Sequence, residues 1–379
     1  MGERLDIENP FYDSDASASA FGWDFKVNAA IFLFLKYLKD VDYLKVEGKH
    51  QDIEIKLKDS SKIFAQAKSI QNGSNDNRKK KFEDAIISLA KTPVDYKNND
   101  KLLYVSNYKA PIDDKDLYDN KIVALKNVKN EHDKVVKIIE EITQRLNNEI
   151  LSNSSLTVTK RAKLEELVKR LQEINTEDLL MCSITPYLNT EQPEDKYQVI
   201  ANLIQEKLTC DFNMTSNNMI RYVRDILKSW QSSFLLNATK SNKDKEKLMT
   251  KLELLLQIIA IISEKDTNNL KESLSFELEE DLEDEYSSYY YKRNFYHERF
   301  DFINMLYYDF KVFNSQNQKD KLNEFIKGEW QKYKDEYADF MEYNDVCAQE
   351  YLIKRDLLRL LSSRTNIDKI IKESSNDNN

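Results

Sequence analysis

Apolar and polar positions along the chain follow two different periods. Over residues 25–38 the apolar side chains are dense and recur at helical spacing, which predicts a buried helix. Three short strand candidates follow, VDYLKVEG (41–48), QDIEIKLK (51–58) and KIFAQAKS (62–69). Periodicity then predicts a helix over 78–91 and a buried strand over 102–108. This order of elements predicts a mixed α/β domain.

A helical hairpin is expected to interrupt this domain. Two helical patterns, at 124–151 and 158–174, have apolar stripes that would face each other in an antiparallel pair. A strand-like run returns at 179–188. The hairpin, about 124–174, is therefore expected as an insertion between two strands of one domain.

Glycine and proline divide the chain into two halves. All five prolines and four of the five glycines lie within residues 1–193. Helix interiors exclude both residue types, so residues 194–379 are predicted to be almost entirely helical. We expect an α/β domain at 1–193 and an all-α domain at 194–379. The scarcity of glycine also leaves no Walker A loop and no GxGxxG motif.

Composition limits the cellular compartments and the kinds of partner that we expect for this protein. The net charge of −9 argues against a surface that binds nucleic acid everywhere, but it leaves room for a local basic site. The start, MGERLDIENP, lacks the apolar core of a signal peptide, and the apolar run at 252–262 is too short to span a bilayer. Cys182, Cys210 and Cys347 include no CxxC pair, which favours a reducing environment. A cytoplasmic protein without a membrane partner is expected.

Polar residues two apart mark the second and third strand candidates. Asp52 and Glu54 are expected on one face of their strand, and Gln66 and Lys68 on one face of theirs. An aspartate followed fourteen residues later by Gln-x-Lys, within this order of elements, is the arrangement of the PD-(D/E)xK nucleases. The sequence therefore predicts an α/β restriction-endonuclease-like (PD-(D/E)xK) domain followed by an all-α C-terminal domain. The alternative interpretation is a solvated antiparallel edge strand.

These residue types suit phosphodiester hydrolysis. A divalent ion, Mg²⁺ or Mn²⁺, polarises a phosphate oxygen and activates water, and it prefers oxygen ligands. Asp52 would supply a carboxylate, Gln66 a neutral amide oxygen and Ala67 a backbone carbonyl. Lys68 would position the water or stabilise the charge of the transition state.

Other charged residues nearby are candidates of second rank. Glu47, at the end of the preceding strand, and Glu54 are further catalytic candidates. A basic run opens the predicted helix at 78–91 and is expected to contact DNA phosphates; it comprises Arg78, Lys79, Lys80 and Lys81. The alternative for this run is a solvated surface.

Four segments together resemble a known family. GWDF before the apolar helix, VEGKHQDIEI, FAQAKS and LLYVSN are similar to the effector nuclease domain of bacterial anti-phage systems often called the Cap-four type, over about residues 20–190. Family members often show Gln after the first element and a doubled acid before the second strand, where this chain has Lys26 and Gln51-Asp52. The resemblance implies a magnesium-dependent endonuclease that cuts double-stranded DNA in antiviral defence.

The helical second half resembles the nuclease subunit of Lamassu systems. That resemblance implies restraint by an SMC-like ATPase and a third small subunit, with a possible homo-oligomer in the active state. We expect the interaction surface near residues 277–313. Two alternatives stay open. One is a catalytically degenerate nuclease fold used for interaction, which the neutral Gln66 favours, and the other is an RNase on the same fold.

Overall fold

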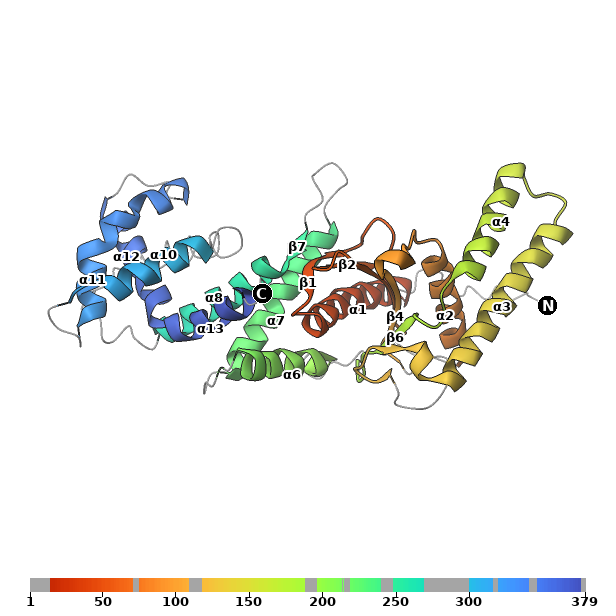
Figure 1. The fold of residues 1–379 in the computed structure, drawn as a ribbon, viewed down its shortest axis with the longest axis horizontal. Helices are drawn as coiled ribbons and strands as arrows, with labels where there is room; N and C mark the ends of the chain where they lie inside the picture. Colours follow the sequence, from red (N-terminus) through yellow and green to blue (C-terminus); the bar gives the residue numbers. More distant parts are fainter. Residues whose placement is uncertain are drawn as a thin grey trace, which may run out of the picture. The chain divides into compact units, whose positions relative to one another are not determined.

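The chain forms two compact units. The structure is a computed structural model that describes residues 14–70, 75–108, 118–187, 196–212, 214, 219–239, 248–268, 300–315, 320–340 and 346–375. The first unit draws on residues 1–203 and 231–251, and the second on 204–230 and 252–379 (Figure 1).

A mixed seven-stranded sheet forms the centre of the first unit, in the order β5-β6-β4-β3-β2-β1-β7. The strands are β1 (Val41–Val46), β2 (Ile53–Leu57), β3 (Lys62–Lys68), β4 (Lys101–Ser106), β5 (Val123–Ala124), β6 (Leu180–Ser183) and β7 (Met249–Thr250). Strands β1, β2 and β3 pair antiparallel, whereas β3 with β4 and β4 with β6 pair parallel. The mixed α/β class predicted from the sequence is confirmed.

Helices cover both faces of this sheet. Five successive residues of β3 are buried, which requires cover on both sides because neighbouring side chains point to opposite faces. Helix α2 (Asn75–Ala90) connects β3 to the parallel strand β4 and packs with Phe64 and Tyr104 in one apolar cluster. Helix α1 (Ser14–Lys36) packs against β1 and β3.

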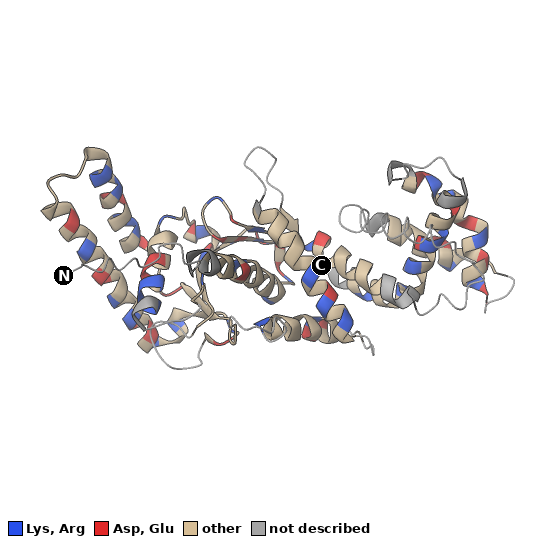
Figure 2. Cartoon of the chain, turned by 180° about the vertical axis from the view of Figure 1, so that it is seen from behind, with Lys and Arg blue, Asp and Glu red and all other residues tan. Residues whose placement is uncertain are grey.

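The predicted hairpin is present between β4 and β6. Helices α3 (Lys129–Ser152) and α4 (Val158–Glu173) pack against each other. The first helix begins later than the predicted residue 124, because Val123 and Ala124 pair with β6 as the short strand β5. Basic and acidic residues are interspersed along both helices, so the hairpin carries both signs of charge along its length (Figure 2).

The described residues beyond 193 are mostly helical, as the sequence predicted. The elements are α6 (Gln198–Glu206), a π-helical turn (Lys207–Asp211), α7 (Met219–Thr239), α8 (Lys251–Asn268), α10 (Phe300–Val312), α11 (Lys321–Glu329), a 3₁₀ segment (Trp330–Phe340), α12 (Val346–Ser362) and α13 (Arg364–Ser375). The polar end of the sequence, KESSNDNN (372–379), predicts disorder from its composition, but α13 continues to Ser375, so this prediction is wrong in part. Of the expected interaction region 277–313, residues 277–299 lie outside the described residues. Among the helices that the structure describes, none is long and apolar enough to cross a membrane.

One strand of the sheet comes from the half that was expected to be all helix. Strand β7 pairs with β1 through Thr250 opposite Tyr43. Nearby, the backbone N–H of Val46 donates a hydrogen bond to Oδ1 of the buried Asn237 (3.1 Å). The sheet unit therefore uses residues well beyond the expected boundary at 193.

Candidate active site

Strands β2 and β3 bring Asp52 and Gln66 together. Asp52 directly precedes β2, whose Ile53 pairs with Ala65 of β3. Its Oδ2 atom accepts a hydrogen bond from Nε2 of Gln66 and another from the backbone N–H of Ala67 (3.1 Å). The pair predicted from residue spacing is therefore in direct contact at the end of the sheet.

Lys68 ends β3 two residues beyond Gln66, so its side chain leaves the same face of the strand. Its ammonium makes no hydrogen bond or ion pair with any other described residue. Burial lowers the pKa of Lys68, and the charges of Lys26 and Lys81 lower it further, while Asp52 opposes the shift. Lys68 is thus a half-buried cation within the field of Asp52.

Helix α2 holds the two buried glutamines of the site. Oε1 of Gln66 accepts a hydrogen bond from the Ser88 hydroxyl (2.9 Å). Nε2 of Gln51 donates to the Ser88 carbonyl (2.9 Å) and to Thr92 Oγ1 (2.7 Å). A carboxylate in place of Gln51 would face that carbonyl without a proton to donate, which explains the amide at this position. Sequence reasoning missed Ser88, because a single helical serine carries no signal.

The Glu54 carboxylate bonds to backbone N–H groups, although strand alternation predicts Glu54 and Asp52 on one face. Its Oε1 accepts hydrogen bonds from the backbone N–H groups of His50 (2.6 Å) and Gln51 (3.3 Å). A Cβ atom on Gly48 would lie 2.3 Å from Cδ of Glu54, so only glycine leaves room for this carboxylate. The contacts of Glu54 therefore favour a role in fixing the loop that presents Asp52.

Glu47 and Asp52 both contact the ammonium of Lys26. Nζ of Lys26 lies 2.7 Å from Oε1 of Glu47 and 3.0 Å from Oδ1 of Asp52. Burial alone would lower the pKa of Lys26, but Asp52 and Glu47 together raise it above its ordinary value. In the sequence, Lys26 is visible only as a departure from the family pattern.

The oxygen donors at this site fit a magnesium or manganese ion. In the part of the chain that the structure describes, no group of three or more His, Cys, Asp and Glu side chains is placed to hold a metal. An ion at this site would need the Gln66 amide and a main-chain oxygen among its ligands. A half-turn of that amide would place Oε1 beside Asp52 and leave Nε2 to donate to Ser88. The N–H and C=O of Ala67 leave the strand on the same side, toward Asp52.

The four basic residues of α2 have different surroundings. Lys79 pairs with Glu141 of α3 (2.9 Å), so its charge is already neutralised. The Arg78 guanidinium lies 5.9 Å from the ring centre of Tyr108. Lys80 and Lys81 are exposed, and neither pairs with a described residue. The four basic residues therefore differ in their contacts: Lys79 is paired, Lys80 and Lys81 are unpaired among the described residues, and Arg78 lies against an aromatic ring.

One face of α2 is turned toward the end of β3. Lys81, Asp84 and Ser88 are spaced three and four residues apart and so share a helix face, and Ser88 contacts Gln66. The charges of both Lys81 and Asp84 act on Lys68. Asp84 is a further acid near the site that the sequence pattern did not single out.

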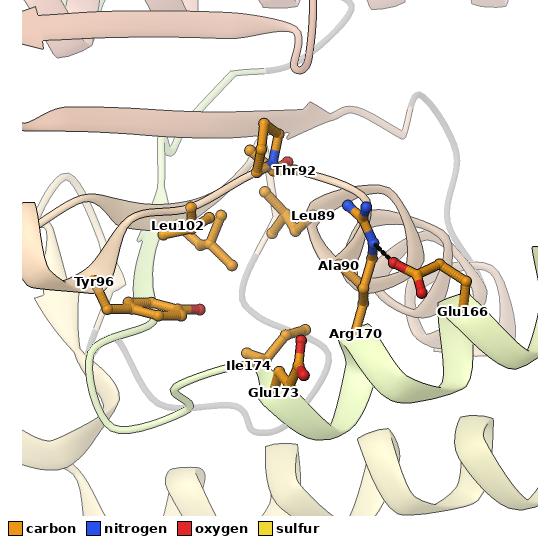
Figure 3. Close-up of a pocket in the computed structure, with 11 residues that line it drawn as sticks. Leu89, Ala90, Thr92, Tyr96, Leu102, Glu166, Arg170, Glu173 and Ile174 are labelled. Atoms are coloured by element: carbon orange, nitrogen blue, oxygen red, sulfur yellow. Dashed lines mark hydrogen bonds and ion pairs between the residues drawn. The ribbon is translucent and has the colours of Figure 1, made fainter.

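A separate pocket of about 230 Å³ lies between the end of α2 and α4 (Figure 3). Its apolar wall includes Leu89, Leu102 and Ile174. On its rim, Nε of Arg170 donates to Glu166 (2.7 Å), and Nη1 donates to the carbonyl of Lys91 (2.9 Å). These charges satisfy one another, so the pocket offers less reactive chemistry than the Asp52 site.

Comparisons of the chain with models of known families, with curated proteins and with solved structures found no match. The fold defines a protein with a mixed α/β sheet unit and a second, helical unit.

Proposed function

We propose that this chain is a metal-dependent DNA endonuclease with a restriction-endonuclease-like (PD-(D/E)xK) first unit. The observation that carries the proposal is the convergence of Asp52, Gln66 and Lys68 at the ends of adjacent strands. The order α1, β1, β2, β3, α2, β4, with a parallel connection through α2, supports it. The unpaired Lys80 and Lys81 supply charge for a phosphate backbone nearby.

Each residue of the site has its own role in the proposed reaction. Asp52, the Gln66 amide and the Ala67 carbonyl would hold Mg²⁺ or Mn²⁺, which would polarise the phosphate and lower the pKa of water. Lys68 would stabilise the negative charge that develops on the phosphate, because its ammonium has no competing partner among the described residues. Ser88 and Gln51 hold the strand end and the helix in register.

A second candidate function is a catalytically degenerate nuclease fold that serves as an interaction module. It is favoured by one observation: the hydrogen bonds of Gln66 to Asp52 and Ser88 are satisfied without a metal. An RNase on the same fold would use the same residues on a different substrate.

The biological setting forms part of the proposal. A cytoplasmic nuclease must be restrained, and the resemblance to Lamassu nuclease subunits supports an effector role in anti-phage defence. An SMC-like ATPase and a third small subunit are the proposed partners.

Nicking of supercoiled plasmid DNA tests the proposal directly. The full chain should cut with Mg²⁺ or Mn²⁺ and not with EDTA, and Asp52→Asn should abolish cutting without loss of the fold. A parallel reaction with RNA distinguishes an RNase. Absence of metal-dependent cutting of either nucleic acid by the folded full chain alone would favour the interaction module.

A further inference from the structure

Lys26 occupies the place between the two carboxylates of the site. It extends from α1 and contacts Glu47 at 2.7 Å and Asp52 at 3.0 Å. Asp52 therefore has separate partners for its two oxygens: Oδ1 contacts the ammonium, and Oδ2 contacts the Gln66 amide. A cation that binds both carboxylates must displace this ammonium or share the carboxylates with it.

The surroundings of Lys26 favour movement over a purely structural role. Its side chain is 25% exposed, and Nζ lies 5.6 Å from the ring centre of Trp23, which is itself 37% exposed. The Lys26 side chain is therefore partly open to solvent. A partly exposed ammonium keeps some of its hydration, so an exchange of its ionic partners does not leave a fully desolvated charge unpaired.

Glu47 reaches Lys26 from a backbone conformation that non-glycine residues seldom adopt. Its φ angle is 52°, in the left-handed region. The backbone N–H of Glu47 is held by the carbonyl of Asp52 (2.7 Å), so the turn joins the two acids directly. Conformations of this kind cluster at active sites, ligand clamps and switch regions.

We infer that Lys26 is an exchangeable counter-ion, which neutralises Asp52 and Glu47 until a divalent ion takes the carboxylates and substrate phosphate takes the ammonium. This inference rests on the proposed metal-dependent nuclease. The exchange creates and removes no covalent bond; it only changes ionic partners. The exchange couples metal binding to DNA binding. Once a divalent ion has taken Asp52 and Glu47, the ammonium of Lys26 needs a phosphate as its new partner.

Metal binding without catalysis tests the exchange. Lys26→Met removes the charge and keeps the length of the side chain. In DNA-free protein, Mn²⁺ binding measured by electron paramagnetic resonance should tighten roughly tenfold, since two carboxylates lose their internal cation. A short duplex with an uncleavable linkage should tighten Mn²⁺ binding in the wild type and much less in the variant.

Lys56→Met is the matched control. Lys56 also pairs with one carboxylate, Asp42 (3.2 Å), and lies 5.5 Å from the ring centre of Tyr43, with a similar exposed fraction of 33%. Its replacement should leave Mn²⁺ affinity unchanged. Thermal unfolding confirms that each variant folds, and Lys26→Gln, which keeps hydrogen-bond donors, replaces Lys26→Met if the latter fails to fold.

Asp52→Asn separates failure of the inference from failure of the proposed function. If this change removes Mn²⁺ binding while Lys26→Met and Lys26→Gln bind Mn²⁺ as the wild type does, the counter-ion role is overturned and the metal site stands. If Asp52→Asn leaves Mn²⁺ binding unchanged, the metal site itself is overturned, and the inference with it.

Discussion

Replacing Gln66 with glutamate should make the stability of the sheet unit depend on divalent metal. The Gln66 amide donates to Asp52, so a carboxylate there loses this bond and places a second negative charge beside the first. The lost hydrogen bond costs about 1 kcal/mol. Like charges about 4 Å apart repel by about 4 kcal/mol at the effective dielectric constant of proteins. Part of this cost disappears if the pair shares a proton, so we expect a loss of about 3–5 kcal/mol at pH 8.

The pH dependence of this loss has a definite sign. The neighbouring Asp52 raises the pKa of the introduced carboxyl group in the folded protein above its unfolded value. The destabilisation is therefore complete above the raised pKa and disappears as the pH falls toward the unfolded pKa. Wild-type protein, with an amide at this position, should lack that component.

Metal should offset part of this loss at pH 8, because two carboxylates beside the Ala67 carbonyl form a stronger ligand set. Mg²⁺ at a hundredfold excess over its dissociation constant stabilises by about 2.7 kcal/mol. For a unit of this size that corresponds to about 5–10 °C in the midpoint of thermal unfolding. Differential scanning calorimetry with Mg²⁺ or EDTA measures the difference, and the wild type should respond less at the same Mg²⁺ concentration.

Gln51 offers a matched control because it is a second buried glutamine bonded to α2. Gln51→Glu would set a charge against the Ser88 carbonyl, which lies 2.9 Å from Nε2. It should destabilise by a similar amount, without rescue by Mg²⁺. Equal metal responses of Gln66→Glu, Gln51→Glu and the wild type would refute the metal site at Asp52.

Three further outcomes follow from individual contacts. Lys68→Met should abolish plasmid nicking, and retained nicking would exclude a catalytic role for Lys68. The midpoint of thermal unfolding should stay level or rise, because removing a half-buried charge without a described partner is not destabilising. Lys81→Ala should weaken DNA binding and reduce by about one the slope of log affinity against log salt concentration. Lys79→Ala should leave this slope unchanged, because Lys79 pairs with Glu141. Equal slopes for the two variants in a fluorescence titration would contradict this assignment. Burial raises the pKa of Cys182 to about 12, so iodoacetamide at pH 8 should label the exposed Cys210 and spare Cys182, as peptide mass spectrometry would show.

The order of elements in the first unit could be predicted because each element has a strong local signal. The helix before the sheet, the three antiparallel strands and α2 all lie where periodicity placed them, within a few residues except at the start of α1. Strand β7 could not be predicted, because two residues with a strand conformation carry no period. Its position depends on pairing with β1, a contact between residues about two hundred positions apart.

The candidate site was predictable only where the strand period applies. Gln66 lies within β3, and its contact with Asp52 follows from the pairing of β2 and β3. Glu54 obeys the same period, yet its flexible side chain turns back to two free backbone N–H groups. Lys26 lies on α1 and Ser88 on α2. Because both lie far along the chain from their partners, no sequence spacing predicts their contacts. Alternation fixes the face from which a side chain leaves, and tertiary contacts decide where its end group lies.

The contacts of the site satisfy nearly every polar group before any ligand arrives. Lys26 neutralises Asp52 and Glu47, and the amide of Gln66 divides its hydrogen bonds between Asp52 and Ser88. Lys68 is the exception, a cation in the field of Asp52 that has no partner among the described residues. On the proposed function, metal must compete with Lys26 for carboxylate, whereas phosphate can approach Lys68 without such competition. Substrate binding would then precede firm metal binding, so the resting protein would hold a folded, metal-poor site that DNA completes.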